Sequence, residues 1–127
     1  MKTTKRIAVY MDHFMANLIE YNDTAKEVKT IKSDFNHFEK EKILQKGESH
    51  LHNKEQDMQN EFYKKIIDEI LKYNEVLLFG FTTAKTELMN ILNDDNNFRS
   101  VKITIKNTDE LTKNQQISFV NECFYID

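Results

Sequence analysis

The pattern of apolar and polar residues predicts three consecutive strands at the start of the chain. Residues 7–11 are a continuous apolar run rich in strand formers, which is typical of a strand covered on both faces. Residues 16–21 alternate as a second strand, and the polar cluster at 22–24 turns the chain into a third strand over 26–32. Lysines in this third strand suit the edge of a sheet, where charge discourages pairing with other chains.

The rest of the chain predicts helices that alternate with strands. A polar segment at about 33–53 shows no periodicity and predicts a long loop. Asn53 and Gln56 then resemble a helix N-cap and its reciprocal partner. Residues 76–79 and 101–105 predict the fourth and fifth strands, the last with one solvent-exposed face.

Each predicted helix carries apolar residues three and four positions apart, so that they share one face. The second helix begins at Thr82 or Thr83, and the third at Thr112, where Gln115 completes a capping box. The residues expected to face the core are Phe62, Ile66, Ile67, Ile70 and Leu71 in the first helix, Ala84, Leu88, Ile91 and Leu92 in the second, and Ile117, Val120 and Phe124 in the third.

The order of these elements predicts an α/β fold, with residues 1–127 as a single domain. Tight turns make the first three strands antiparallel, whereas the later strand-helix-strand units need right-handed crossovers. A mixed five-stranded sheet follows, in the spatial order 3-2-1-4-5 and with helices on both faces. This is the ribonuclease H-like arrangement.

In such an open sheet, a ligand is expected outside the carboxyl ends of strands one and four, because the connections leave there in opposite directions. Amide groups at the start of the second helix, with nearby hydroxyls and a lysine, could hold a phosphate or carboxylate. The simpler interpretation is that the threonines cap this helix and the lysine is solvated. The residues predicted to line the crevice are Asp12, His13, Thr82, Thr83 and Lys85, with His50 and His52 from the long loop.

Catalytic and metal-binding interpretations of these residues find less support in the sequence. Asp12 and Glu61 would need a further carboxylate at the end of strand four for two-metal nuclease chemistry, and threonine and phenylalanine stand there. Asp12 is then a turn-forming residue. The four histidines lack the paired spacing of a zinc site, and Cys123 has no neighbouring histidine or lysine to activate it. We therefore expect no catalytic residue, metal or cofactor.

Composition and charge limit the partners that we expect. A lone cysteine fits a reducing cytoplasm, and no apolar stretch approaches the roughly 20 residues that would span a bilayer. The formal net charge of −3 among 127 residues gives no overall attraction for polyanions. We expect a cytoplasmic protein that does not bind membranes and does not bind nucleic acid tightly and nonspecifically.

The segment at residues 76–88, VLLFGFTTAKTEL, resembles the strand, glycine, lysine and "TEL" segment in the middle domain of archaeal and eukaryotic class-one peptide-chain release factors. Bacterial single-domain relatives, called host-attachment or translational-machinery-like proteins, resemble the chain at 9–13, 50–53 and 109–116 as well. The similarity runs from about residue 6 to residue 124. It implies the sheet order deduced above and a role in translation.

One departure from the release factors bears on activity. Their loop before the first helix carries Gly-Gly-Gln, whereas the comparable place here, residues 46–50, reads KGESH. The resemblance therefore implies a non-catalytic protein that binds ribosomes, tRNA or translation-associated proteins, without peptide release. The alternative is a small-ligand or phosphate-binding enzyme that uses the crevice. A third hypothesis is a module that forms homodimers through its exposed sheet edge.

Overall fold

The computed structural model describes residues 5–33 and 48–125, with side chains described outside 48–55. Five strands and three helices lie within these ranges, and a short 3₁₀ turn, η1, follows the second helix. In chain order the elements are β1 (Arg6–Met11), β2 (Met15–Asn22), β3 (Thr24–Lys32), α2 (Glu48–Ile70), β4 (Glu75–Gly80), α3 (Ala84–Asn93), η1 (Asn96–Phe98), β5 (Lys102–Asn107) and α4 (Lys113–Tyr125).

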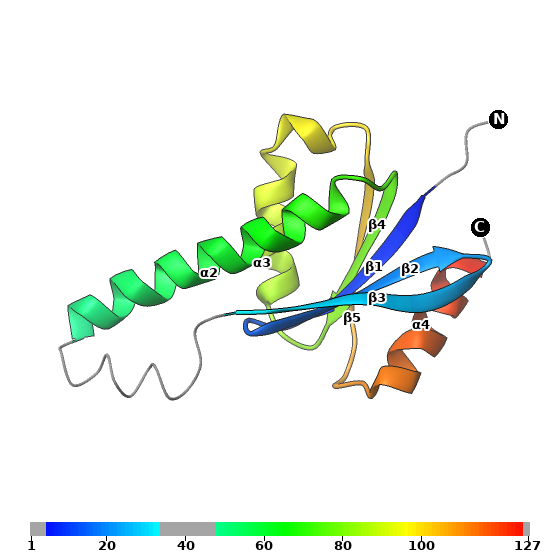
Figure 1. Cartoon of the computed structure of the whole chain (residues 1–127), viewed down its shortest axis with the longest axis horizontal. Coiled ribbons are helices and arrows are strands. Elements are labelled where there is room, and N and C mark those ends of the chain that lie inside the picture. The colour runs from blue at the N-terminus through cyan, green and yellow to red at the C-terminus, as the bar shows by residue number, and fades with distance from the viewer. Residues whose placement is uncertain (1–4, 34–47, 126–127) are drawn as a thin grey trace.

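The strands form one sheet in the order β3-β2-β1-β4-β5, as the sequence predicts. The β1-β2 and β2-β3 pairs are antiparallel, whereas β1-β4 and β4-β5 are parallel. Helices α2 and α3 cover one face of the sheet, and α4 covers the other (Figure 1). The mixed, open α/β sheet with helices on both faces is thus confirmed, while its assignment as ribonuclease H-like stays a prediction.

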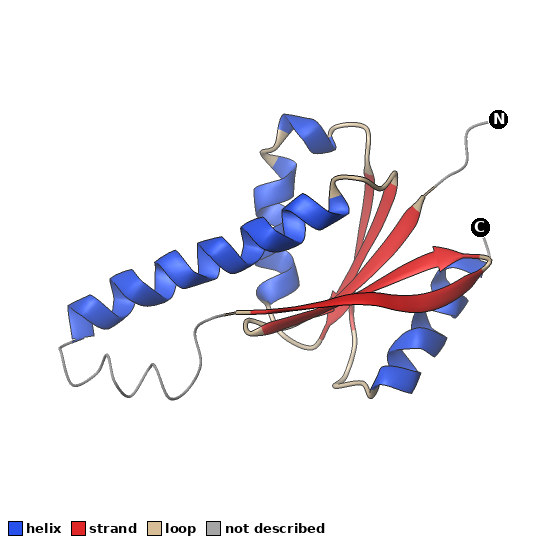
Figure 2. Ribbon diagram, in the orientation of Figure 1, coloured by secondary structure: helices blue, strands red, loops and turns tan. Residues whose placement is uncertain are grey.

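Strands β1 and β4 are buried on both faces because each carries an unbroken apolar run. Helices lie on both sides of the sheet that contains them (Figure 2). Successive residues of a strand point to opposite faces, so β1 supplies both parts of the core. Ile7, Val9 and Met11 join the cluster beneath α2 and α3. Ala8 and Tyr10 join the smaller cluster beneath α4.

Helix α2 begins earlier than the sequence pattern predicts. It begins at Glu48, so the predicted N-cap at Asn53 is wrong and the predicted loop at 33–53 ends sooner. Residues 48–53 contain no proline or glycine, the two residues that most disfavour a helix interior, so the backbone there can join the helix. The rest of the predicted loop, residues 34–47, lies outside the described residues.

Two residues expected to face the core do not. Leu71 lies just beyond the end of α2 and is exposed, and Ile91 is exposed on α3. The stripe of α3 that packs on the sheet is narrow, formed by Ala84, Leu88 and Leu92, and it leaves Ile91 outside. Among the described helices, none is both long and apolar enough to cross a membrane.

Strand β3 lies at one edge of the sheet, as its lysines predict. Its register against β2 shifts between Leu18 and Ile19, which pair with Lys29 and Glu27. Val28 is therefore the extra residue of a β-bulge, and its side chain is exposed. A bulge and charged side chains both discourage strand pairing, so this edge is poorly suited to a dimer interface.

Candidate functional site

The carboxyl ends of β1 and β4 meet where the sequence predicts a crevice. The two strands are parallel neighbours, with Tyr10 opposite Phe79. Gly80 then approaches the β1 backbone so closely that a Cβ atom on it would lie 2.5 Å from the Met11 carbonyl oxygen. Its φ of +154° is one that side-chain-bearing residues rarely adopt, so both the space and the backbone angle require glycine here.

Asp12 shapes the turn that follows β1. Its Oδ1 atom accepts hydrogen bonds from the backbone N–H groups of Phe14, at 2.7 Å, and Met15, at 2.8 Å. The Asp12 N–H in turn donates to the Met15 carbonyl oxygen at 3.0 Å. The turn-forming interpretation of Asp12 is confirmed, because one carboxylate oxygen is held by backbone donors.

A carboxylate that the sequence analysis did not single out joins the elements at this end of the sheet. The Tyr63 hydroxyl of α2 donates to Glu87 Oε1 at 2.7 Å, and His13 Nε2 lies 3.0 Å from Glu87 Oε2. The Thr83 hydroxyl lies 3.4 Å from the same Oε2 atom. We call His13, Tyr63, Thr83 and Glu87 the Glu87 cluster. It joins α2, α3 and the turn after β1.

The hydrogen bonds of the Glu87 cluster favour the ionised carboxylate. Burial raises the pKa of Glu87, but hydrogen bonds from His13 and Tyr63 outweigh it and hold this pKa below its ordinary value. Burial, and then the hydrogen bond to Glu87, raise the pKa of the Tyr63 hydroxyl well above its usual range. The cluster therefore holds a carboxylate with neutral tyrosine at neutral pH.

Lys85 does not face solvent, in contrast to both interpretations of it from the sequence. Only 3% of the residue is exposed, and its Nζ atom donates to the Thr82 carbonyl oxygen. Burial lowers the pKa of Lys85. A lysine held in this way is poorly placed to bind an incoming phosphate, so the structure gives this proposed role no support.

The two threonines before α3 differ in what their hydroxyls do. Thr82 Oγ1 accepts a hydrogen bond from the Ala84 N–H at 3.3 Å. Thr83 occupies the N-cap position, but its side chain makes no cap hydrogen bond. The sequence predicted that one of the two threonines caps α3. In the structure Thr83 holds the N-cap position, but it is the Thr82 hydroxyl that accepts a backbone hydrogen bond there.

His50 and His52 lie in the first turns of α2 rather than in a loop. Their side chains are not among those described, so their place in the crevice stays a prediction. Within residues 5–33 and 48–125, no group of three histidine, cysteine, aspartate or glutamate residues is placed to hold a metal ion. Cys123 is partly buried against the apolar cluster beneath α4.

Two exposed aromatic residues lie close in the chain to members of the Glu87 cluster, and neither was predicted as a site residue. Phe14 lies in the turn after β1 and is 54% exposed, and Phe81 directly follows Gly80 and is 46% exposed. Both come from segments that leave the carboxyl ends of the central strands. We call Phe14 and Phe81 the aromatic tip. Exposed aromatic side chains are enriched where proteins bind partners.

Comparison with known proteins shows what the fold is similar to. No family model matches the chain, and no curated protein matches its sequence. A crystal structure of Archaeoglobus fulgidus Pelota has a TM-score of 0.62 at 7% identity over 97% of this chain. A crystal structure of Thermoplasma acidophilum Pelota has a TM-score of 0.60 at 16% identity over 93% of this chain. The chain spans about a third of each Pelota chain, so the likeness is to one part of those proteins and concerns the fold.

Proposed function

We propose that this chain is a non-catalytic, translation-associated binding domain that contacts the ribosome. The observation that carries the proposal is the fold, which matches part of two Pelota structures over 97% and 93% of the chain. Pelota neighbours favour a translation-related role. The resemblance of residues 76–88 to the release-factor middle domain favours the same role.

The aromatic tip is the proposed contact surface. Phe14 and Phe81 are exposed, whereas the neighbouring Glu87 cluster is held by hydrogen bonds between three elements. Hydrogen bonds that hold the segments carrying these aromatic side chains reduce the entropy lost when a partner binds. The absence of Gly-Gly-Gln at residues 46–50 supports binding without peptide release.

The alternative, a phosphate-binding enzyme, gains nothing from the geometry. Its proposed cation, Lys85, is buried and bonded to the Thr82 carbonyl oxygen. The Asp12 carboxylate is engaged by two backbone N–H groups through one of its oxygens. We therefore keep the binding role as the proposal for this chain.

Co-sedimentation tests the proposal directly. The full chain is added to a cell extract at low salt, and the ribosomal pellet is compared with the supernatant. We expect the protein in the pellet, and we expect the double variant Phe14→Ala/Phe81→Ala to move largely to the supernatant. Val28→Ala, which removes an exposed apolar side chain at the sheet edge, serves as the control and should still pellet.

The outcome that contradicts the proposal is a wild-type chain that stays wholly in the supernatant. A double variant that pellets like the wild type would leave ribosome contact intact but contradict the aromatic tip as its surface. Circular dichroism of both variants checks that they remain folded. Because both replaced side chains are about half exposed, we expect only small losses of stability.

A further inference from the structure

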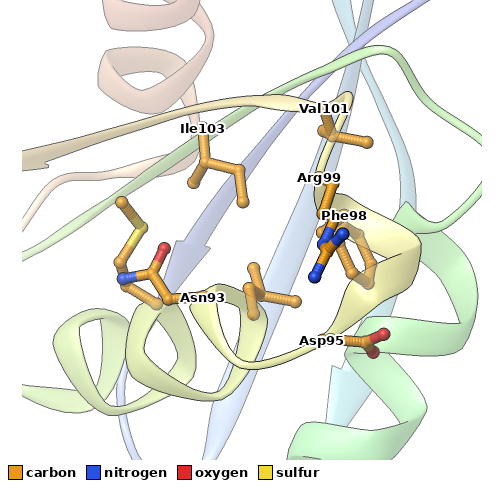
Figure 3. Close-up of a pocket in the computed structure, with 8 residues that line it drawn as sticks. Asn93, Asp95, Phe98, Arg99, Val101 and Ile103 are labelled. Carbon is orange, nitrogen blue, oxygen red and sulfur yellow. The ribbon is translucent and has the colours of Figure 1, made fainter.

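A hollow of about 300 Å³ lies between α3, η1 and the start of β5, away from the Glu87 cluster (Figure 3). Apolar residues stand behind its polar rim. Leu92 and Phe98 are almost fully buried, and Met89, Val101 and Ile103, which pack against the same core, are partly exposed. A volume near the lower end for small-molecule sites, about 300 Å³, restricts the occupant to a small molecule.

Two opposite charges stand at the rim of this hollow, and they do not pair with each other. Asp95 and Arg99 flank the two ends of η1, and Figure 3 shows them in the same part of the hollow, with Asn93 across from them. Among the described residues, the Arg99 guanidinium has no hydrogen-bond or ion-pair partner. Asp95 precedes η1 and Arg99 follows it, and both line the hollow, so a ligand there can meet both charges.

The Asp95 carboxylate is positioned by the fold. Its Oδ1 atom accepts a hydrogen bond from the Asn97 N–H at 2.9 Å, as the N-cap of η1. This bond uses one oxygen atom and leaves the other available to a donor on a ligand. Arg99 follows the end of η1, and its planar guanidinium suits a carboxylate, which it can bind through two parallel hydrogen bonds.

We propose that this hollow is a binding site for a small apolar α-amino acid. The ligand carboxylate would bind Arg99, its ammonium group would bind Asp95, and its aliphatic side chain would lie on the partly exposed Met89 and Ile103. This ligand class follows from the charges. A simple carboxylic acid would leave the Asp95 carboxylate facing its own negative charge, and a simple amine would leave Arg99 unpaired. A zwitterion satisfies both groups.

The test uses the full chain labelled with ¹⁵N and titrated with L-leucine to about 10 mM, a range suited to a weak small-ligand site. We expect amide shifts that saturate and that concentrate at Leu92, Phe98, Val101 and Ile103. Two probes each lack one charge: 4-methylpentanoate lacks the ammonium group, and 3-methylbutylamine lacks the carboxylate. We expect each to bind at least about tenfold more weakly than leucine, as the loss of one charge-assisted hydrogen-bonded pair implies.

Two pairs of variants locate the charges. Asp95→Asn keeps an oxygen for the η1 cap but removes the charge, and Asp94→Asn removes a neighbouring exposed charge outside the hollow. Arg99→Gln removes the guanidinium, and Lys106→Gln removes an exposed cation of β5 outside the lining. We expect a loss of about tenfold or more in leucine affinity for Asp95→Asn and Arg99→Gln, and no change for their controls.

Three outcomes would each overturn the proposal. The first is the absence of any saturating shift with leucine. The second is binding of 4-methylpentanoate or 3-methylbutylamine as tightly as leucine, which would mean that the site recognises only one of the two charges of the amino acid. The third is an Arg99→Gln variant that binds leucine like the wild type. None of these results bears on ribosome contact, so this proposal and the proposed function fail separately.

Discussion

At each end of β1 and β4, a glutamate joins neighbouring elements of the fold, but the two glutamates have different partners. At the amino ends, Glu75 accepts a hydrogen bond from Arg6 at 3.3 Å, and Lys102 lies 3.9 Å from its other oxygen. The Arg6 guanidinium also lies over the ring of Phe124. At the carboxyl ends, Glu87 is held by tyrosine, histidine and threonine.

This difference separates a structural end of the sheet from a candidate site. Glu75 and its cations compensate each other's charge across β1, β4 and β5. The exposed aromatic residue near them, Tyr125, follows Phe124 at the end of α4 and is not part of these strands.

Glu87 has no lysine or arginine partner among the described residues. In the chain, Phe14 directly follows its partner His13, while Phe81 lies just before its partner Thr83. A carboxylate held by tyrosine, histidine and threonine, near exposed aromatic side chains, is the more promising feature for binding.

Replacing Gly80 should have the largest effect, because it breaks the contact on which the carboxyl end depends. In Gly80→Ala, the new Cβ would meet the Met11 carbonyl oxygen at 2.5 Å, and the φ of +154° would strain any side-chain-bearing residue. We expect the free energy of unfolding to fall by about 3 kcal/mol or more. Urea denaturation measures it. Asn90→Ala, at an exposed position of α3, is the control, and a Gly80→Ala loss as small as the control's would contradict this account.

The second prediction concerns Glu75 and its ion pairs at the amino ends of the strands. Glu75→Gln keeps one hydrogen-bond acceptor but removes the charge that Arg6 and Lys102 share, in a residue that is almost fully buried. We expect the free energy of unfolding to fall by about 1 to 2 kcal/mol at low salt, and by less at high salt. Glu122→Gln, on the exposed side of α4, should change it little. Equal effects of the two variants would mean that the amino-end ion pairs contribute nothing.

Glu87→Gln should have a smaller effect that depends on pH. The pKa of Glu87 is lowered in the folded state, so the ionised group stabilises the fold above its ordinary value near 4.5. That contribution is lost as the pH falls through the lower folded pKa. Because half of this side chain is exposed and glutamine still accepts from Tyr63, we expect a loss of only about 0.5 to 1 kcal/mol at about pH 6.

As the pH falls through the lowered folded pKa, the stabilities of the wild type and Glu87→Gln should converge, because the carboxyl group then becomes protonated in the folded chain as well as in the unfolded one. Urea denaturation in a series of buffers from about pH 6 downward measures the difference. A gap that persists unchanged in acid would show that the glutamine disturbs packing instead of removing a charge.

The parts of the fold that the sequence predicted correctly rest on local patterns. Continuous apolar runs identified β1 and β4 as central, and the spacing of Thr112 and Gln115 predicted a capping box that the structure contains. The start of α2 was missed because a helix needs no strong cap where the preceding residues can also adopt helical angles.

The candidate site was predicted less completely, because its contacts join distant residues. The sequence indicated that the turn after β1 and the start of α3 lie together, and the strand register bears this out. It did not indicate Glu87, whose partners Tyr63 and His13 lie 24 and 74 residues away in the chain. Nor did it indicate that Lys85 would be buried, since a lysine on a helix is usually solvated and only packing reveals the exception.

The smallest effect is expected at Thr83, and it separates two roles of a threonine at a helix start. Thr83→Val keeps the β-branched shape and removes only a hydroxyl that lies 3.4 Å from Glu87 and caps nothing, so we expect a loss of at most about 0.3 kcal/mol. Thr112→Val is the matched control. Its hydroxyl accepts from the Gln115 N–H at 3.2 Å, and its loss should cost about 1 kcal/mol. If both variants lose equal stability, Thr83 is structural; if Thr83→Val is as stable as expected but pellets less with ribosomes, its hydroxyl belongs to the contact surface.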